Sequence, residues 1–596
     1  MSRSSHRYKL VLITISLFVA ILLIKVYTNI YTNQYAVRSY IPALRGNIYD
    51  SRGRLLATSE VVYGVYLDLN YLRSFSGNAF KKSPDFLRLL NAFGVTEQLG
   101  EIDKRSILRL GVVGSRQEAL KKIPTQFLRF VAIVPEERRI SLSDFGLSAI
   151  IGKTDQRHGI SGVEAYFDKI LRPVRDGIIS ITYSGVFGKP LSSVKIDPEN
   201  GKNVRITIDS ELQRQLYTLA QEYKEKKQAT EVGVLVMESN TGKVRAALTT
   251  QSWPTYYMGY IEPGSTIKPI LFSAAIELGL VKPNTQYYCP GYVKPIEDLN
   301  LTIKDLEVHK DINLYDGLVH SCNVVSVLTT KSIVDSLGTE KLYEVFQSFG
   351  FGKETGIELQ GEIPGKLNTP DKWYRADWAF MAIGQSIGVT PVQLLAAFNT
   401  IVNDGIYVSP TLDEGKEGTK KRVISKSTAD VVKQMLRDVV ERGTGINAKI
   451  DGIEIYGKTG TAQKNQKKDV TAVFVGQAVL DTLYTIMVWV DSPQTEKLSS
   501  VVAAPFFKEV VLTLKDYQNH LSNSGKQIYT TFPDITGWNI SQLKELAEST
   551  NIALRINSAG LYVEKYATST TMDETNTIVV DVWLSDTPMP LKRIIR

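Results

Sequence analysis

The chain has 596 residues, and 43% of them are hydrophobic, so it can bury more than one hydrophobic core. Its formal net charge is +8, but no basic cluster interleaved with aromatic residues, no zinc-ligand spacing and no phosphate-binding glycine loop accompanies that charge. Nucleic-acid binding is therefore not expected. The two cysteines are too few for a disulfide framework.

An apolar run near the N-terminus predicts a membrane span. The run extends from Leu10 to Ile24, and the stretch from Tyr8 to Tyr27 approaches the roughly 20 residues needed to cross a bilayer. A cleavable signal peptide is the alternative, but no clear small-residue cleavage site follows the run. Basic residues without acidic ones precede it, which predicts a cytoplasmic N-terminus and export of everything after about residue 28. These basic residues are Arg3, Arg7 and Lys9.

The segments that follow predict several folded parts. Residues 28–204 mix short strand-like and helix-like stretches, with a strand expected from Val61 to Leu69 and a helix from Phe86 to Phe93. Farther along, Val232 to Glu238 is an apolar run typical of a buried strand, and Leu394 to Val402 is expected to be helical. This alternation favours an α/β domain in the middle of the chain.

A turn at Gly264 precedes a mostly apolar stretch, Thr266 to Leu280, that predicts a helix. Ser265 would then lie at the helix N-terminus, where backbone N–H groups favour developing negative charge. Lys268 lies on the same helix face, within reach of the Ser265 hydroxyl. Because serine is a weak nucleophile, it needs a base, and a lysine can serve only if its pKa is depressed. We therefore expect Lys268 to be buried and to face a second cation, Lys458.

Two more segments supply candidate site residues. The hydroxyl of Ser321 can pass a proton toward a leaving amine, and the amide of Asn323 can hydrogen-bond both a substrate and Lys268. An alternating stretch, Ile453 to Gly457, predicts a strand that leads into Lys458.

The residues from Lys458 to Thr461 can bind a substrate. Lys458 and Thr459 would hold a carboxylate, and Gly460 would permit close approach by an extended peptide. The N–H groups of Thr461 and Ser265 would form an oxyanion hole, in which each donor is typically worth about 3 kcal/mol.

Together these residues form three motifs in one order: Ser265-Thr-Ile-Lys268, Ser321-Cys-Asn323 and Lys458-Thr-Gly-Thr461. The first two motifs are weak alone, because each recurs elsewhere, as in Ser192-Ser-Val-Lys195 and Ser76-Gly-Asn78. Their order, separation and flanking residues make the combination specific. An S-x-x-K / S-x-N / K-T-G constellation belongs to the penicillin-recognising serine enzymes.

The chain resembles the class B penicillin-binding proteins, membrane-anchored D,D-transpeptidases that cross-link peptidoglycan. The resemblance covers most of the chain, and one departure is Ser51-Arg52-Gly53, where the family usually has Arg-Asn-Gly; we expect it to affect packing of the non-catalytic domain. The other matching segments are Arg45-Gly-Asn-Ile-Tyr-Asp50, Gly159-Ile-Ser-Gly162, Thr207-Ile-Asp209, Ala382-Ile-Gly-Gln385 and Gly443-Thr-Gly445.

The C-terminus resembles a PASTA domain, a small β-α-β module of cell-wall enzymes. Phe532 to Trp538 leads into an expected helix, Ile540 to Ser549, and strand-like runs follow at Ile552 to Ile556 and Ile578 to Leu584. The alternative is a small stabilising appendage without a ligand.

The resemblance implies a multidomain α/β fold in which a mixed α+β pedestal carries an α/β-sandwich transpeptidase domain. The expected parts are a cytoplasmic tail (1–9), a transmembrane helix (10–27), the pedestal (28–204), the transpeptidase domain (205–515), a linker (516–530), the PASTA-like domain (531–585) and a basic tail (586–596).

The implied activity is acyl transfer through Ser265, which would attack the D-Ala-D-Ala bond of a stem peptide and also be acylated by β-lactams. No cofactor or metal is expected. The implied partners are stem peptides, β-lactams, the cytoplasmic membrane, a SEDS-type glycan polymerase and other divisome or elongasome proteins. The catalytic domain would be extracytoplasmic.

Two alternatives use the same motifs. The chain could be a D,D-carboxypeptidase or a β-lactamase. In the β-lactamase case, Glu358, which follows Ser321 in the chain, is the candidate for a deacylating base. A non-catalytic β-lactam-binding receptor or divisome scaffold is a further alternative, against which the intact Ser265, Lys268 and Lys458 count.

Other residues are expected to be structural. Cys289 and Cys322 are predicted to be free thiols, because a bridge at Cys322 would strain or occlude the cleft, although an exported compartment would permit one. His320 neighbours a motif, but no Ser-His-Asp triad accompanies it.

Overall fold

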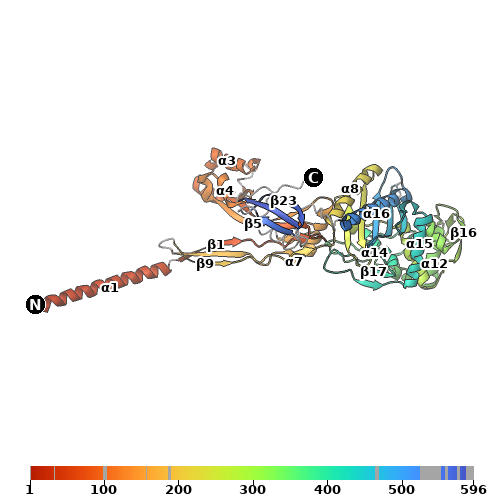
Figure 1. Cartoon of the computed structure of the whole chain (residues 1–596), viewed down its shortest axis with the longest axis horizontal. Coiled ribbons are helices and arrows are strands. Elements are labelled where there is room, and N and C mark those ends of the chain that lie inside the picture. The colour runs from red at the N-terminus through yellow and green to blue at the C-terminus, as the bar shows by residue number, and fades with distance from the viewer. Residues whose placement is uncertain are drawn as a thin grey trace. The chain divides into compact units, whose positions relative to one another are not determined.

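The computed structural model describes most of the chain (Figure 1). The described residues are 2–32, 34–97, 102, 104–155, 157–184, 189–463, 469–523, 552–556, 562–572 and 578–585. They belong to two compact units. The first unit comprises Met1–Gly46, Thr58–Ile140 and Leu171–Lys202, and the second comprises Asn47–Ala57, Ser141–Ile170 and Asn203–Arg596. The range expected to form the pedestal, 28–204, therefore contains residues of both units, since 47–57, 141–170 and 203–204 belong to the second.

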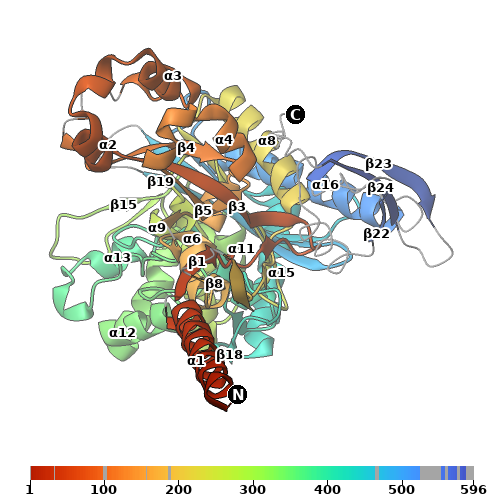
Figure 2. The same ribbon diagram turned by 90° about the vertical axis from the view of Figure 1, so that its left-hand side faces the viewer.

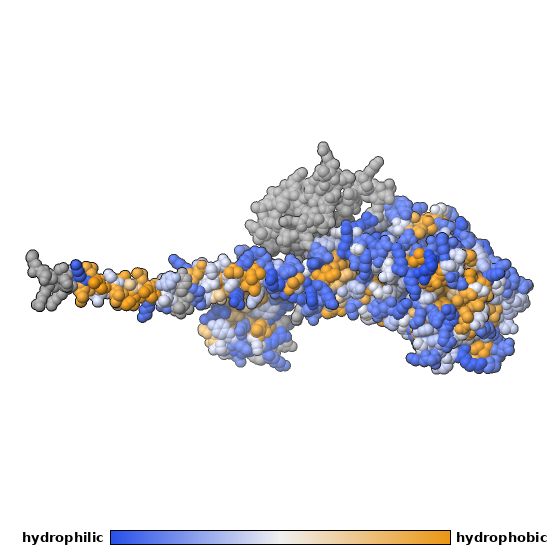
Figure 3. All heavy atoms as spheres, turned by 90° about the horizontal axis from the view of Figure 1, so that it is seen from below, coloured by the Kyte–Doolittle hydropathy of each residue, from blue (hydrophilic) through white to orange (hydrophobic). Residues whose placement is uncertain are grey.

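The first unit begins with a long helix, α1 (Ser2–Thr32). Within it, Tyr8–Asn29 is long and apolar enough to cross a membrane, and Figure 3 shows its apolar side chains in orange. β1 (Gln34–Ile41) follows and pairs antiparallel with β8 (Gly177–Ser184), which pairs with β9 (Pro190–Ile196). The helix agrees with the span expected from the sequence.

A separate hydrophobic core of the first unit lies against β3 (Leu55–Asp68), whose last residues pair antiparallel with β4 (Ile107–Val113). Phe86 and Leu89 are fully buried in this core, because they share the apolar face of helix α3 (Pro84–Ala92). The expected strand and helix correspond to β3 and α3. Other elements of this part are α2 (Leu69–Ser76), α4 (Arg116–Lys122) and β5 (Val131–Ser141).

The second unit is built on a five-stranded antiparallel sheet in the order β12-β11-β21-β20-β19. Both faces of the sheet are covered, so its strands are almost entirely buried. The strands are β11 (Glu231–Glu238), β12 (Val244–Thr249), β19 (Ile455–Gln463), β20 (Val470–Val479) and β21 (Leu483–Asp491). The strand expected from Val232 to Glu238 is therefore confirmed as β11.

Helices α8 (Ser210–Lys227) and α16 (Ser499–Asn523) pack together over one face of the sheet. Figure 2 shows the two helices side by side. Their contact includes stacked rings of Tyr223 and Phe506, whose centroids lie 4.4 Å apart. On the other face lies α14 (Pro391–Val402), which contains the helix expected from Leu394. A capping box formed by Thr390 and Gln393 begins α14.

Beyond α14, a group of helices completes the second unit. α10 (Lys268–Glu277) packs against α12 (Asn323–Ser348) and α15 (Lys426–Arg442). Shorter elements are β2 (Ile48–Tyr49), α5 (Leu147–Ile151), α6 (Gly162–Tyr166), β10 (Val204–Arg205), α9 (Thr255–Met258), β13 (Gln286–Cys289), β14 (Tyr292–Val293), β15 (Ile303–Lys304), β16 (Lys310–Asn313), α11 (Leu314–Val319), α13 (Asp377–Met381), β17 (Ile406–Val408) and β18 (Lys420–Arg422).

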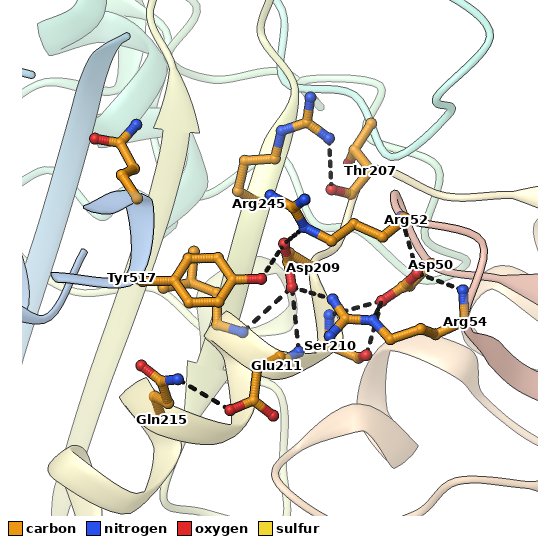
Figure 4. A network of polar contacts seen from close by, with 12 residues as sticks. Asp50, Arg52, Arg54, Thr207, Asp209, Ser210, Glu211, Gln215, Arg245 and Tyr517 are labelled. Carbon is orange, nitrogen blue, oxygen red and sulfur yellow. Dashed lines mark hydrogen bonds and ion pairs between the residues drawn. The ribbon is translucent and has the colours of Figure 1, made fainter. Parts of the chain in front are cut away.

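Asp209 joins distant parts of the second unit through a network of charged side chains (Figure 4). It caps the N-terminus of α8 and accepts hydrogen bonds from Arg52, Arg54 and the Tyr517 hydroxyl. Burial alone would raise the pKa of Asp209, but Arg54, Tyr517 and Arg52 lower it below its ordinary value. The carboxylate therefore stays charged and binds the segment 50–54 and α16 to the start of α8.

Asp50 strengthens the same junction, because its carboxylate accepts hydrogen bonds from both the N–H and the hydroxyl of Ser210. The Arg52 Nε atom lies 2.5 Å from an Asp209 oxygen. The departure from the family at Arg52 thus contributes an ion pair within the second unit, whereas we had expected it to affect packing of the non-catalytic domain.

The linker expected over 516–530 begins inside α16, which continues to Asn523. The helix continues because Leu514 and Tyr517 are buried in the core of the second unit, and Tyr517 also hydrogen-bonds Asp209. The expected end of the transpeptidase domain at residue 515 therefore cuts a packed helix.

Near the C-terminus, β22 (Ile552–Ile556), β24 (Ile578–Ser585) and β23 (Tyr562–Met572) form a three-stranded sheet in that order (Figure 2). β22 and β24 agree with the two expected strands, and β23 was not expected. The helix expected from Ile540 to Ser549 lies outside the described residues.

Candidate active site

Ser265 lies in a turn of 3₁₀-helix, Gly264–Ile267, that leads directly into α10. The α-helix is therefore shorter than the expected 266–280, but the serine precedes it as predicted. Pro269 occupies the first turn of α10, where its missing N–H costs no helical hydrogen bond. Among the described residues, none hydrogen-bonds the Ser265 hydroxyl.

Lys268, at the first position of α10, is completely buried. Its Nζ atom donates to the Ser321 carbonyl oxygen at 2.6 Å, to the Asn323 Oδ1 at 2.7 Å and to the Ser321 Oγ at 3.4 Å. Burial lowers the pKa of Lys268 to about 8, although the nearby Asp305 carboxylate opposes this shift. An appreciable neutral fraction therefore exists near neutral pH, as a general base requires.

Ser321 stands between α11 and α12 with its backbone in the left-handed region, at a φ of 59°. A serine rarely adopts this conformation, and such strain is typical of functional sites. The turn points both polar groups of Ser321 at lysines: its carbonyl accepts from Lys268, and its hydroxyl accepts from Lys458 at 2.8 Å.

Lys458 lies in β19, so the third motif forms part of the strand that was expected to precede it. The side chain is fully buried, and its Nζ atom also donates to the Thr459 carbonyl at 3.1 Å. Burial, and then repulsion from Lys268, lowers the pKa of Lys458 well below its ordinary value. Lys268 is buried as expected, and Lys458, whose burial was not expected, reaches the same Ser321 hydroxyl.

Close contacts at two glycines hold the turn Gly264–Ile267, which we call the nucleophile turn, against β19. A side chain at Gly460 would lie 2.7 Å from the Thr266 Cγ2 atom and 2.8 Å from the Pro263 carbonyl, and one at Gly264 would lie 3.0 Å from the Thr461 carbonyl. The space beside Gly460 is thus filled by the nucleophile turn, whereas we had expected it to admit a substrate backbone.

The other side of the turn is equally tight. Gly384 has a φ of 77° and packs closely against Gly264. A Cβ atom at Gly384 would lie 2.1 Å from the Gly264 carbonyl oxygen. The Gly264 N–H also donates to the Gly384 carbonyl at 3.1 Å. The Ala382-Ile-Gly-Gln385 segment therefore has a physical role, which is to support the turn that carries Ser265.

Thr459 and Thr461 share the face of β19 opposite to Lys458, because side chains alternate along a strand. Their hydroxyls bond to residues outside the three motifs: Thr459 to Thr444 at 2.9 Å, and Thr461 to Ser499 at 3.0 Å. Thr444 lies inside the recognised Gly443-Thr-Gly445 segment, which could have indicated it. No motif indicated Ser499.

Asp305 is a further residue that no motif indicated. It follows β15, and one of its oxygens accepts from the Cys322 thiol at 2.8 Å, from the Asn323 N–H at 3.0 Å and from the Cys289 thiol at 3.4 Å. Both cysteines are free and buried, in agreement with the expectation.

Glu358, the candidate deacylating base, is fully engaged away from this cleft. Its buried carboxylate accepts from the Thr411 hydroxyl and the Leu412 N–H, and it pairs with Lys416 at 2.7 Å. His320 packs beside His309, with ring centroids 5.8 Å apart. Neither residue hydrogen-bonds the two catalytic-motif lysines in the described part of the chain.

The chain is similar to known proteins over most of its length. Residues 232–512 match the family model described as the penicillin binding protein transpeptidase domain. Stage V sporulation protein D of Bacillus subtilis is 27% identical over 85% of this chain and 85% of its own length. The penicillin-binding protein PbpB of Mycolicibacterium smegmatis is 29% identical over 82% of this chain and 85% of its own. The probable peptidoglycan D,D-transpeptidase PbpC of Pseudomonas aeruginosa is 25% identical over 79% and 86%.

A solved structure extends the likeness to the fold. Penicillin binding protein 3 of Mycobacterium tuberculosis, in complex with aztreonam, superposes with a TM-score of 0.59 at 23% identity, covering 81% of this chain and 97% of that one. Taken together, the match of residues 232–512 to a penicillin binding protein transpeptidase domain and the likeness to named peptidoglycan D,D-transpeptidases show a serine-type acyl-transfer enzyme.

Proposed function

We propose that this chain is a membrane-anchored D,D-transpeptidase that cross-links peptidoglycan stem peptides through an acyl-enzyme on Ser265. One observation carries the proposal: the buried ammonium groups of Lys268 and Lys458 converge on the Ser321 hydroxyl beside the nucleophile turn. Such an array can take a proton from one oxygen and return it to a leaving amine.

In the acylation step, the Ser265 Oγ attacks the carbonyl carbon of the D-Ala-D-Ala bond while neutral Lys268 accepts the serine proton. The Oγ–C bond forms, the C–N bond breaks, and the terminal D-Ala leaves as an amine. Ser321 passes that amine a proton, which Lys458 helps to resupply through its 2.8 Å contact. In the second step, an amine of a neighbouring stem peptide attacks the ester and releases Ser265.

Lys268 must turn toward Ser265 for this chemistry. In the structure the Lys268 Nζ atom donates hydrogen bonds to Ser321 and Asn323. Of these, the hydrogen bond to the Ser321 hydroxyl is the longest, at 3.4 Å. Loss of that one contact lets the neutral amine accept from Ser265, and such catalytic hydrogen bonds often tighten only when substrate binds.

The substrate would lie along β19. This strand is the last one in the sheet order, so an extended peptide can add to its outer edge. The N–H groups of Ser265 and Thr461 would bind the developing oxyanion, and the tight contact between Gly264 and Thr461 supports their proximity.

The substrate carboxylate would bind the hydroxyls of Thr459 and Thr461. We had assigned Lys458 to this role, but its side chain is fully buried and its Nζ atom already serves Ser321 and the Thr459 carbonyl. Lys458 would then act on the carboxylate only through its charge.

The length and apolar composition of α1 support membrane anchoring. The basic residues that precede the span support a catalytic domain outside the cytoplasm. A SEDS-type glycan polymerase would supply the glycan strands. The C-terminal sheet formed by β22, β24 and β23 would belong to a PASTA-like domain. A cysteine-reactive, membrane-impermeant label on an exposed engineered cysteine, compared in intact and lysed cells, tests the orientation.

Labelling with a fluorescent penicillin tests the activity. The intact chain should form a stable adduct, and Ser265→Ala should form none. An adduct that vanishes within minutes would favour the D,D-carboxypeptidase or β-lactamase alternative, and no adduct on folded protein would favour a non-catalytic scaffold. The engagement of Glu358 by Thr411, Leu412 and Lys416 supports slow deacylation.

A further inference from the structure

The carboxylate of Asp305 organises the segment that carries two of the proposed catalytic residues. Its Oδ2 atom accepts from the N–H of Asn323 at 3.0 Å and of Val324 at 3.5 Å, which are the first residues of α12. A carboxylate at this place satisfies unpaired N–H groups and complements the positive end of the helix. The same atom accepts from the thiol of Cys322, between Ser321 and Asn323.

The segment around Asp305 is itself held in place. The Asp305 N–H donates to the Gly291 carbonyl at 2.8 Å, and its Oδ1 atom accepts from the Leu306 N–H at 2.8 Å. The Asn323 side chain adds a second connection, because its Nδ2 donates to the Lys304 carbonyl at 2.9 Å while its Oδ1 accepts from Lys268. A continuous chain of hydrogen bonds thus runs from Asp305 through Asn323 to Lys268.

Asp305 also acts on Lys268 through its charge. The titratable groups that face Lys268 are Asp305 after β15, Cys322 before α12 and Lys458 on β19. Burial raises the pKa of the Cys322 thiol, so this group is neutral. Burial also raises the pKa of Asp305, but the Cys322 hydrogen bond and the Lys268 charge lower it below its usual value. In the part of the chain that the structure describes, Asp305 is therefore the anion that opposes repulsion between the two lysines.

We propose that Asp305 is a positioning residue of the acyl-transfer site, which fixes the Ser321–Asn323 turn by capping α12 and supplies the negative charge that holds Lys268 as an ammonium between catalytic steps. This inference rests on the proposed function, because it assigns Lys268 the role of general base. It makes Asp305 responsible for the pH range in which Lys268 can accept the Ser265 proton.

The variant Asp305→Asn tests the charge separately from the shape, because an amide keeps one acceptor oxygen and nearly the same volume. The rate of acylation by a fluorescent penicillin should be followed from about pH 6 to about pH 9.5. Without the negative charge, the Lys268 ammonium is less stable, so we expect the midpoint of the rise in rate to move down by about one pH unit. Asp311→Asn, the same change at an exposed position in β16, should leave the midpoint unchanged.

A second measurement does not depend on activity. The thermal midpoint of unfolding should be compared for the intact chain and Asp305→Asn over the same pH range. Below about pH 8, where Lys268 is charged, the variant leaves that buried cation without Asp305, so the difference in midpoint should grow as the pH falls. At higher pH only the lost cap remains, and the difference should be smaller.

The outcomes separate two failures. The charge role of Asp305 would be overturned if Asp305→Asn left the pH dependence of the acylation rate unchanged and lowered the thermal midpoint equally at every pH. Asp305 would then act only as the cap of α12. If thermal unfolding shows the pH-dependent difference but the intact chain forms no penicillin adduct, the proposed function fails while Asp305 and Lys268 remain coupled.

Discussion

The Nζ atom of Lys458 lies 2.8 Å from the Oγ atom of Ser321, and the lysine is fully buried. This contact places Lys458 behind the proton-transfer hydroxyl. Lys458→Met, which keeps an unbranched side chain one atom shorter and removes the charge, should therefore slow acylation by about 100-fold or more. The loss should be similar for a β-lactam and for a thioester that lacks a carboxylate.

The control for that prediction is Thr459→Val, which removes a hydroxyl from the opposite face of β19. Thr459→Val should slow acylation by the carboxylate-bearing β-lactam more than acylation by the thioester that lacks a carboxylate. A Lys458→Met variant that loses activity only toward the carboxylate-bearing ligand would return the anchor role to Lys458.

The lowered pKa of Lys268 predicts a specific pH dependence. Because a base must be neutral, acylation should be slow well below pH 8 and should rise through an apparent pKa of about 8. Lys268→Arg should be almost inactive at every pH, since an arginine stays protonated. Second-order rate constants for penicillin acylation across this range provide the measurement. A flat profile, or a Lys268→Arg variant that is still acylated, would remove Lys268 from the role of base.

The left-handed backbone of Ser321 separates its structural and chemical roles. Ser321→Ala keeps the unfavourable conformation at φ 59°, whereas Ser321→Gly relieves it. We expect the glycine variant to be more stable to urea than the alanine variant by about 1 kcal/mol. Both lack the hydroxyl and should lose acylation by about 100-fold. Equal stability of the two variants would contradict strain at this turn.

The contact between Gly384 and Gly264 predicts that a single methyl group disturbs the nucleophile. In Gly384→Ala the new Cβ would meet the Gly264 carbonyl, so Ser265 must move, and acylation should fall by at least about 10-fold. Gly452→Ala is a matched control, because its φ is also 77° but it has no neighbouring atom within 4 Å. It should lose some stability and retain its acylation rate. Equal rate losses in the two variants would indicate a backbone effect alone.

The sequence could predict the parts of this site that depend on local spacing. Ser265 and Lys268 lie one helical turn apart, so their proximity follows from helix geometry, and the burial of Lys268 follows from its need for a lowered pKa. Asp305 and Ser499 could not be predicted, because chain folding over long separations brings them to Asn323 and Thr461. The same limit applies to the segment 47–57. It belongs to the second unit, although residues of the first unit separate it in the chain from the rest of the second unit.

The extension of α16 beyond residue 515 makes the end of the catalytic unit testable. Tyr517 is buried, and its hydroxyl donates to Asp209 at 2.6 Å, next to the ion pairs of Arg52 and Arg54. A chain that ends at Lys515 should therefore be less stable to urea than one that ends at Asn523. Tyr517→Phe removes the hydrogen bond to a charged acceptor and should cost about 2 kcal/mol of unfolding free energy. Tyr374→Phe, at an exposed position, should cost almost nothing. If the two truncated chains were equally stable, α16 would end its structural role before Tyr517, and Asp209 would be held by its arginines alone.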